Sequence, residues 1–167
     1  RECGQMQSND RSVMFLDPFG MQVSWKSIKM IAASGKIDLW YLAPVGPAYA
    51  RLMARHGEIP DLRRRLLDEA LGGPEWQSLY KTLPPDMLGY TAACREPGWN
   101  EIATYFMKRW KQVFGAGALT TALTLGHPAR QPLLLCFACL NSSPAAYSIA
   151  LRIAGSLVEG AKGGQLI

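Results

Sequence analysis

Asp17 is the residue whose type and position most directly suggest chemistry. It follows the apolar run Val13 to Leu16 and opens the turn Asp17-Pro18-Phe19-Gly20. Open α/β sheets bind their ligands beyond the carboxyl ends of the strands, where a carboxylate can accept hydrogen bonds from a substrate. Asp-Pro is also a common start of a turn. The sequence therefore leaves two interpretations open, a working carboxylate or a residue that only ends a strand.

A second group of candidates is cationic and would suit the phosphates of a nucleic acid. It comprises Arg51, Arg55, Arg63, Arg64, Arg65, Lys108, Arg109 and Lys111. On a helix starting near Pro60, an amphipathic pattern turns the arginines to water and four leucines inward, namely Leu62, Leu66, Leu67 and Leu71. Pairs between Arg64 and Asp68 and between Arg65 and Glu69 would make an ordinary solvated face. Because cations near a helix start oppose its dipole, an anion-binding face stays open as the alternative.

Cys136 and Cys139 have the CxxC spacing of many metal and redox sites. Positions three apart in a strand point to opposite faces, and the residues around these two are apolar. We therefore expect buried, reduced thiols, no metal site and a cytoplasmic protein.

The composition is that of a globular, mildly basic protein. The 167 residues are 49% hydrophobic and 19% charged, with a formal net charge of +5. One domain is expected at this length, and the charge permits an anionic partner without requiring one. No apolar run is long enough to span a membrane, so we expect no membrane association.

The hydropathy pattern predicts an α/β fold in which strands alternate with helices. Strands are expected at 13–16, 37–42, 119–125 and 133–140, the last two as an antiparallel hairpin. Helices are expected at 25–34, 48–55, 60–71, 74–83 and 100–114, and from residue 144 onward. The unbroken apolar run at 13–16 predicts a strand covered on both faces. The last helix should bury Ala146, Ala150, Ile153, Ala154 and Leu157, and 160–167 should form a flexible tail.

This order of elements resembles the second half of a class I methyltransferase domain, whose Rossmann-like sheet has strand order 3-2-1-4-5-7-6. The resemblance implies that the chain supplies strands 4, 5, 6 and 7, arranged as 4-5-7-6. Residues 1–159 would be the C-terminal part of a single domain, with a helical insertion at 47–114. The glycine-rich loop that holds S-adenosylmethionine follows strand 1 in such domains. We therefore expect the cofactor-binding half to be missing, with the cofactor bound only by a longer protein.

Three segments of the sequence resemble the three-Cys-motif partner protein family (TcmP). They are FLDPFGMQVSWKSIKMIAASGKIDLWYLAPVG, the following YARLM, and the late LLLCFACLNSSPAAYSIALRIAGSLV. The likeness covers most of Val13 to Val158. It implies a methyltransferase-like protein that acts on or with nucleic acid, together with a three-cysteine protein encoded beside it. The alternative is a non-catalytic partner that keeps the fold without methyl transfer.

The resemblance also implies roles for the turn residues Asp17, Pro18, Phe19 and Gly20. Amino-group methyltransferases of nucleic acids carry an (Asp/Asn)-Pro-Pro-(Tyr/Phe) turn at this place. Its polar oxygens accept hydrogen bonds from the exocyclic amine while the aromatic ring stacks on the base. Here the aromatic residue stands one position earlier, and glycine occupies its usual place.

The first strand has a further consequence for association. On the methyltransferase arrangement its outer side would pair with strand 1, which this chain lacks. An edge strand with unpaired backbone groups and few charges favours pairing with another chain. We therefore expect the 167-residue chain to self-associate through this edge.

Overall fold

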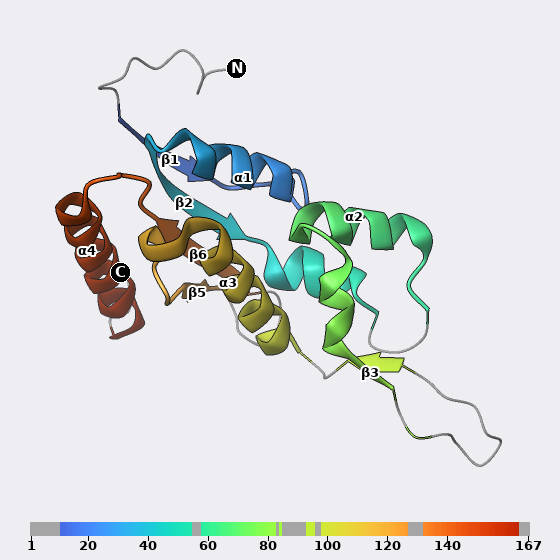
Figure 1. Cartoon of the computed structure of the whole chain (residues 1–167). Coiled ribbons are helices and arrows are strands. Elements are labelled where there is room, and N and C mark those ends of the chain that lie inside the picture. Colours follow the sequence, from blue (N-terminus) through green and yellow to red (C-terminus); the bar gives the residue numbers. More distant parts are fainter. Residues whose placement is uncertain are drawn as a thin grey trace.

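The computed structural model describes residues 11–54, 58–82, 84, 93–95, 98–126 and 132–163. These residues form an α/β fold with a mixed four-stranded sheet and a separate two-stranded hairpin (Figure 1). The sheet contains β1 (Ser12–Leu16), β2 (Ile37–Ala43), β5 (Leu123–Leu125) and β6 (Leu133–Ala138). The predicted α/β class is confirmed at this level.

The strands lie in the order β1-β2-β6-β5. β1 and β2 are parallel, with Phe15 opposite Trp40, whereas β6 runs antiparallel to both of its neighbours. The predicted parallel pair, the antiparallel closing hairpin and the order of neighbours are therefore confirmed.

Helices occupy the segments between these strands. They are α1 (Trp25–Ser34), the π-helical η2 (Val45–Ala50), α2 (Asp61–Leu71), the 3-10 helix η3 (Pro74–Leu79), α3 (Asn100–Phe114), the 3-10 turn η4 (Gly115–Gly117) and α4 (Pro144–Gly163). Gly35 ends α1 with φ +63°, and Gly72 ends α2 with φ +83°. Both glycines adopt the left-handed conformation that side chains disfavour, which stops each helix at that point.

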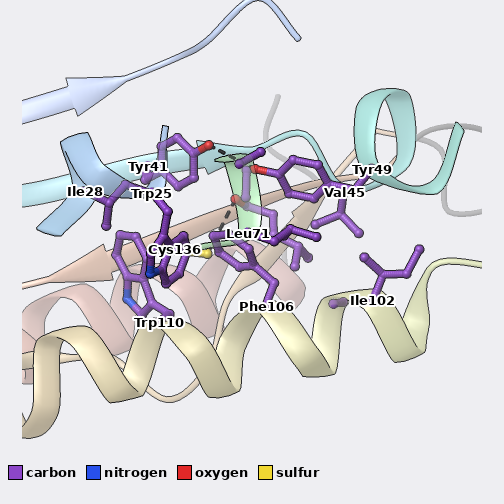
Figure 2. Close-up of a cluster of buried hydrophobic side chains, with 14 of the residues drawn as sticks. Trp25, Ile28, Tyr41, Val45, Tyr49, Leu71, Ile102, Phe106, Trp110 and Cys136 are labelled. Carbon is purple, nitrogen blue, oxygen red and sulfur yellow. Dashed lines mark hydrogen bonds between the residues drawn. The ribbon is translucent and has the colours of Figure 1, made fainter. Parts of the chain in front are cut away.

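The main core lies between one face of the sheet and the helices α1, α2 and α3. Leu39 and Tyr41 of β2 point to this face, where they meet Trp25, Phe106 and Trp110. Figure 2 shows this cluster of large aromatic and aliphatic side chains, with Cys136 among them. The largest fully buried side chains of this core are aromatic, so each of them buries more apolar surface than its aliphatic neighbours do.

Among the described residues, α4 is the one helix on the opposite face of the sheet. Trp40, Phe137 and Cys139 point to this side and pack against Ala154 and Tyr147 of the helix. The rings of Trp40 and Phe137 have centroids 4.6 Å apart. α4 therefore covers the middle of this face and leaves its β1 end bare.

Two expectations about burial are wrong. β1 is not covered on both faces, because Val13 is 72% exposed and Phe15 is 59% exposed. In α4 the predicted buried residues Ile153 and Leu157 are exposed, whereas Ala154 is buried as predicted and Val158 is buried in addition. Both errors have one cause: α4 covers only part of this face within the described residues, whereas the prediction took both faces of the sheet to be fully covered.

The segment predicted as a helix at 74–83 is different in the structure. Only Pro74–Leu79 is helical, and Tyr80–Thr82 forms β3, which pairs antiparallel with β4 (Ala93–Arg95). This hairpin was not predicted, because each strand has only three residues and no alternating apolar pattern.

Three boundaries also differ from the predictions. The strand expected at 119–125 is interrupted: Leu119 pairs with Phe137, and regular pairing resumes only at β5. The helix expected at 48–55 begins earlier, as η2. α4 continues to Gly163, into the segment expected as a tail, while 164–167 lie outside the described residues.

Candidate functional site

The turn Asp17-Pro18-Phe19-Gly20 lies at the carboxyl end of β1, with two of its side chains in the open. Asp17 is exposed and Phe19 is 88% exposed. Gly20 has φ +70°, and no heavy atom lies within 4 Å of the place that a Cβ would take. A left-handed conformation favours glycine, which explains why no aromatic residue stands at this position. The turn leaves the Asp17 carboxylate and the Phe19 ring accessible to a ligand.

The start of α1 anchors this turn in the core. The Ser24 hydroxyl accepts a hydrogen bond from the Ser27 N–H at 3.1 Å, which caps the helix. Trp25 follows and is buried, with its ring edge-to-face on Phe106 at a centroid distance of 5.8 Å. The exposed turn is therefore held at both ends, by the paired strand β1 before it and by the buried side chain of Trp25 after it.

The segment from η2 to η3 lies at the same end of the sheet as the turn, whereas α3 packs across one face of the sheet (Figure 1). The carboxyl ends of β1 and β2 both point toward the side of the molecule on which α2 lies (Figure 1). Trp25 makes the junction, because a Cβ on Gly72 at the end of α2 would collide with its indole. The end of α2 thus lies close to the residue that follows the turn, whereas Arg63, Arg64 and Arg65 lie in the first half of that helix.

The predicted arginine face of α2 is solvent-exposed. Arg63, Arg64 and Arg65 are all exposed, as is Arg51 beyond η2. Arg64 donates from Nη2 to the carbonyl oxygen of Ile59 at 3.3 Å, which holds it at the start of the helix. Arg55 lies outside the described residues.

The apolar face of α2 is narrower than predicted. Leu67 and Leu71 are buried, but Leu62 is 70% exposed and Leu66 is also exposed. Asp68, the predicted partner of Arg64, instead accepts a hydrogen bond from the Trp76 indole at 2.7 Å. Because only the second half of α2 touches the core, its first half presents arginines and leucines together to solvent.

The three cations predicted on α3 divide into two kinds. Lys108 and Lys111 are exposed, whereas Arg109 is half-buried. Arg109 donates from Nη2 to the carbonyl oxygen of Gly72 at 2.9 Å, and its guanidinium lies 5.7 Å from the centre of the Trp25 ring. These contacts link α3 to α1 and α2, so the Arg109 guanidinium already serves the fold.

Lys108 also lines a surface groove of about 390 Å³ that the sequence analysis did not anticipate. The groove lies between α3 and the η3–β3 segment, and its polar lining includes Ser78, Lys81, Asn100, Thr104 and Tyr105. The buried Tyr105 hydroxyl has no hydrogen-bond partner among the described residues. The pKa of Tyr105 is raised, mainly by burial. The missed β3–β4 hairpin explains why sequence patterns did not bring Lys81 and Lys108 together.

The CxxC cysteines are both buried, as predicted. Cys136 points into the main core and Cys139 to the α4 side, so their thiols lie on opposite faces of β6. Burial raises the pKa of both thiols, which keeps them protonated. In the described part of the chain, no three His, Cys, Asp or Glu side chains are grouped as a metal site would need.

The described residues do not fit S-adenosylmethionine. The connection from β1 to α1 has one glycine, Gly20, and it lies in open surroundings without a cradle. The connection after β2 carries Gly46, whose N–H donates to the carbonyl oxygen of Pro132 at 2.8 Å. A nucleotide-like cofactor needs several free backbone N–H groups in a glycine-rich turn, and neither connection supplies them.

The comparisons with known proteins give no family and no relative. No protein-family model, curated protein or solved structure matches this chain. Within the described residues, no helix combines the length and apolar character that crossing a membrane requires. Function must therefore be argued from the exposed turn and the cationic surface.

Proposed function

We propose that the chain is part of a Rossmann-like, methyltransferase-type domain that acts on or with nucleic acid. The strand order β1-β2-β6-β5, with one parallel pair and an antiparallel hairpin, supports this because it equals the 4-5-7-6 part of that sheet. The helical segment at the carboxyl end of the parallel strands also supports it, since ligands of such sheets bind there. S-adenosylmethionine belongs to the proposal only for a longer protein that brings its own cofactor loop.

The observation that carries the proposal is the exposure of Phe19 beside Asp17. The phenyl ring of Phe19 is 88% exposed, so it does not stabilise the core, and its apolar surface stays in unfavourable contact with water. Such a ring can stack on an unpaired base, and the neighbouring carboxylate can accept hydrogen bonds from an exocyclic amine. We assign base stacking to Phe19 and amine recognition to Asp17.

The exposed cations supply the second half of the proposed interface. Arg63, Arg64 and Arg65 stand on one exposed turn of α2, and Lys108 and Lys111 stand on α3. Both helices meet the start of α1, which directly follows the Asp17 turn. Phosphates held by these cations would position a strand whose base reaches Phe19.

The test is the affinity of the chain for a labelled single-stranded oligonucleotide, of DNA and of RNA, by fluorescence anisotropy. Phe19→Ala should weaken binding by about 5- to 150-fold, since base stacking contributes about 1–3 kcal/mol. Met30→Ala is the matched control, because Met30 is also an exposed apolar side chain but lies on α1 away from the turn. Equal affinity of Phe19→Ala and Met30→Ala would contradict the assigned role.

A second candidate is a non-catalytic partner of a three-cysteine protein. The displaced aromatic residue at Phe19 and the absence of a cofactor cradle among the described residues both favour it. Calorimetry with S-adenosylmethionine on the longest available gene product separates the candidates. Cofactor binding supports the enzyme, whereas a stable complex with the three-cysteine protein without cofactor binding supports the partner.

We also place the protein in the reducing cytoplasm. Cys94, Cys136 and Cys139 are free thiols, although two of them are close in sequence. Free cysteines are typical of reducing compartments. Thiol counting of the protein isolated without reductant would test this assignment.

A further inference from the structure

β1 is an edge strand whose outer side is open within the described part of the chain. It stands at one end of the four-stranded sheet and pairs there with β2 alone. The Ser12 N–H donates to the carbonyl oxygen of Lys36 at 3.0 Å, so the even-numbered residues of β1 direct their backbone groups to β2. Because these directions alternate along a strand, the odd-numbered residues direct theirs outward.

The side chains of the same odd-numbered residues form an exposed apolar face. Val13 and Phe15 are largely exposed, and Phe15 also lines a groove of about 390 Å³ between the sheet and α4. The other lining residues are Trp40, Leu123, Leu135, Leu157 and Val158. An open strand edge beside an uncovered apolar face is a surface that favours association.

The charges at the ends of β1 identify the occupant of this edge. Arg11 precedes the strand, Asp17 follows it, and both are exposed. We propose that, where no further strand covers this edge, two copies of the chain pair their β1 strands antiparallel, around a twofold axis at Met14. Val13 then lies opposite Phe15 of the second copy, and Arg11 lies opposite its Asp17. The same two contacts are repeated by symmetry, as in other isologous dimers.

The neighbouring registers lack this complementarity. A shift in one direction would set Arg11 against Phe15, and a shift in the other would set Asp17 against Val13. Each would place a charge against an apolar side chain and leave both ion pairs unmade. Arg11 donates from Nη1 to the carbonyl oxygen of Gly35 at 2.6 Å, on the β2 side of the strand, so its exposed side chain turns outward when it pairs with Asp17 of the second copy.

The first test is the molar mass of the 167-residue chain by light scattering at several concentrations. The chain should be a dimer, and Val13→Lys should make it monomeric, because a lysine at an outward-facing edge position blocks strand pairing. Met30→Lys is the control, since Met30 is 65% exposed on α1, and it should stay dimeric. A monomeric wild-type chain, or a dimer that Val13→Lys leaves unchanged, would overturn the proposal.

The second test reads the register directly. In a background with Cys3→Ser and Cys94→Ser, Met14→Cys should form a disulfide-linked dimer on oxidation. Residues facing each other at a non-hydrogen-bonded antiparallel pair have Cα atoms about 4.5 Å apart, within disulfide reach. Val13→Cys should not cross-link, because two copies of position 13 would be more than about 7 Å apart. Cross-linking of Val13→Cys in place of Met14→Cys would refute this register, and a dimer that cross-links at neither position would refute the interface.

Discussion

The hydroxyl groups of Tyr41 and Tyr49 lie 3.2 Å apart and hydrogen-bond to each other in the interior. Tyr41 belongs to β2 and Tyr49 to η2, so this bond ties the π-helical turn to the end of the strand (Figure 2). Both rings also pack on Phe106 of α3. The pair therefore fixes the segment that leaves the carboxyl end of the sheet, next to the candidate site.

Changing one tyrosine of this pair should destabilise the protein more than changing both. Tyr49→Phe leaves the Tyr41 hydroxyl buried without a partner, at a cost of about 1–3 kcal/mol in the free energy of unfolding. Tyr41→Phe together with Tyr49→Phe removes both polar groups and should cost no more than either single change. Urea denaturation of the four proteins measures the coupling, and additive single effects would contradict this account.

The same pair makes stability depend on alkaline pH. Burial raises the pKa of Tyr41 to about 12 and raises the pKa of Tyr49 well above its ordinary value. Above pH 10 the unfolded chain loses these protons while the folded chain keeps them, so the free energy of unfolding falls as the pH rises. The fall approaches about 1.4 kcal/mol per pH unit for each tyrosine between pH 10 and 12.

The pH effect is isolated by comparing the wild type with the double Tyr→Phe variant. Both proteins share the buried Cys136, whose raised pKa adds a decline that begins near pH 9. Lysine and arginine titration is common to both as well. The stability of the wild type minus that of the double variant should therefore be constant below pH 10 and should fall steadily above it. A constant difference up to pH 12 would show that these hydroxyls titrate normally.

The fold could be predicted where a long helix has a periodic apolar stripe and that stripe packs against another element of the chain. The helix at 100–114 has the predicted bounds because Ile102, Phe106 and Trp110 form one stripe that meets the sheet. The parallel pair and closing hairpin follow from short apolar runs and their connections. The exposure of Val13 and Ile153 could not be predicted. A hydropathy pattern shows that an apolar residue is suited to burial, but it does not show whether another element covers that residue.

The candidate site was predicted in part for a similar reason. Asp17 and Phe19 could be assigned to a strand end because a turn follows an apolar run, and the arginines of α2 could be assigned to an exposed helix because they follow one another beside buried leucines; their roles stay predictions. Arg109 looked equivalent to Lys108 in the sequence, but only the structure brings it over Trp25. The groove with Lys81 depends on a three-residue strand pairing, for which the sequence carries no clear signal.

Gly72 should be among the least replaceable residues of the chain. It has φ +83°, and a Cβ there would overlap the indole of Trp25, the residue that anchors the candidate turn. Gly72→Ala should lower the free energy of unfolding by about 2–5 kcal/mol, combining left-handed strain with overpacking. Gly98→Ala is the matched control, because Gly98 has φ +96° with nothing within 4 Å, and it should cost only about 1 kcal/mol. Similar losses in the two variants, measured by thermal or urea unfolding, would show that the Trp25 contact is unimportant.

The arginine face of α2 should determine how nucleic-acid affinity depends on salt. If Arg63, Arg64 and Arg65 each neutralise one phosphate, their joint change to Ala should reduce the slope of log K against log salt by about 2 for a single strand. The control is the triple change of Arg11, Lys29 and Arg152 to Ala, which removes three exposed cations that are neither in the first turn of α1 nor on α2. This control lowers the net charge equally but should leave the slope nearly unchanged, because counterions are released only at contacted phosphates. Anisotropy titrations from about 50 to 200 mM salt cover the range in which the difference is measurable. Equal slopes for the two triple variants would assign the arginines to an ordinary solvated face, since net charge alone would then account for binding.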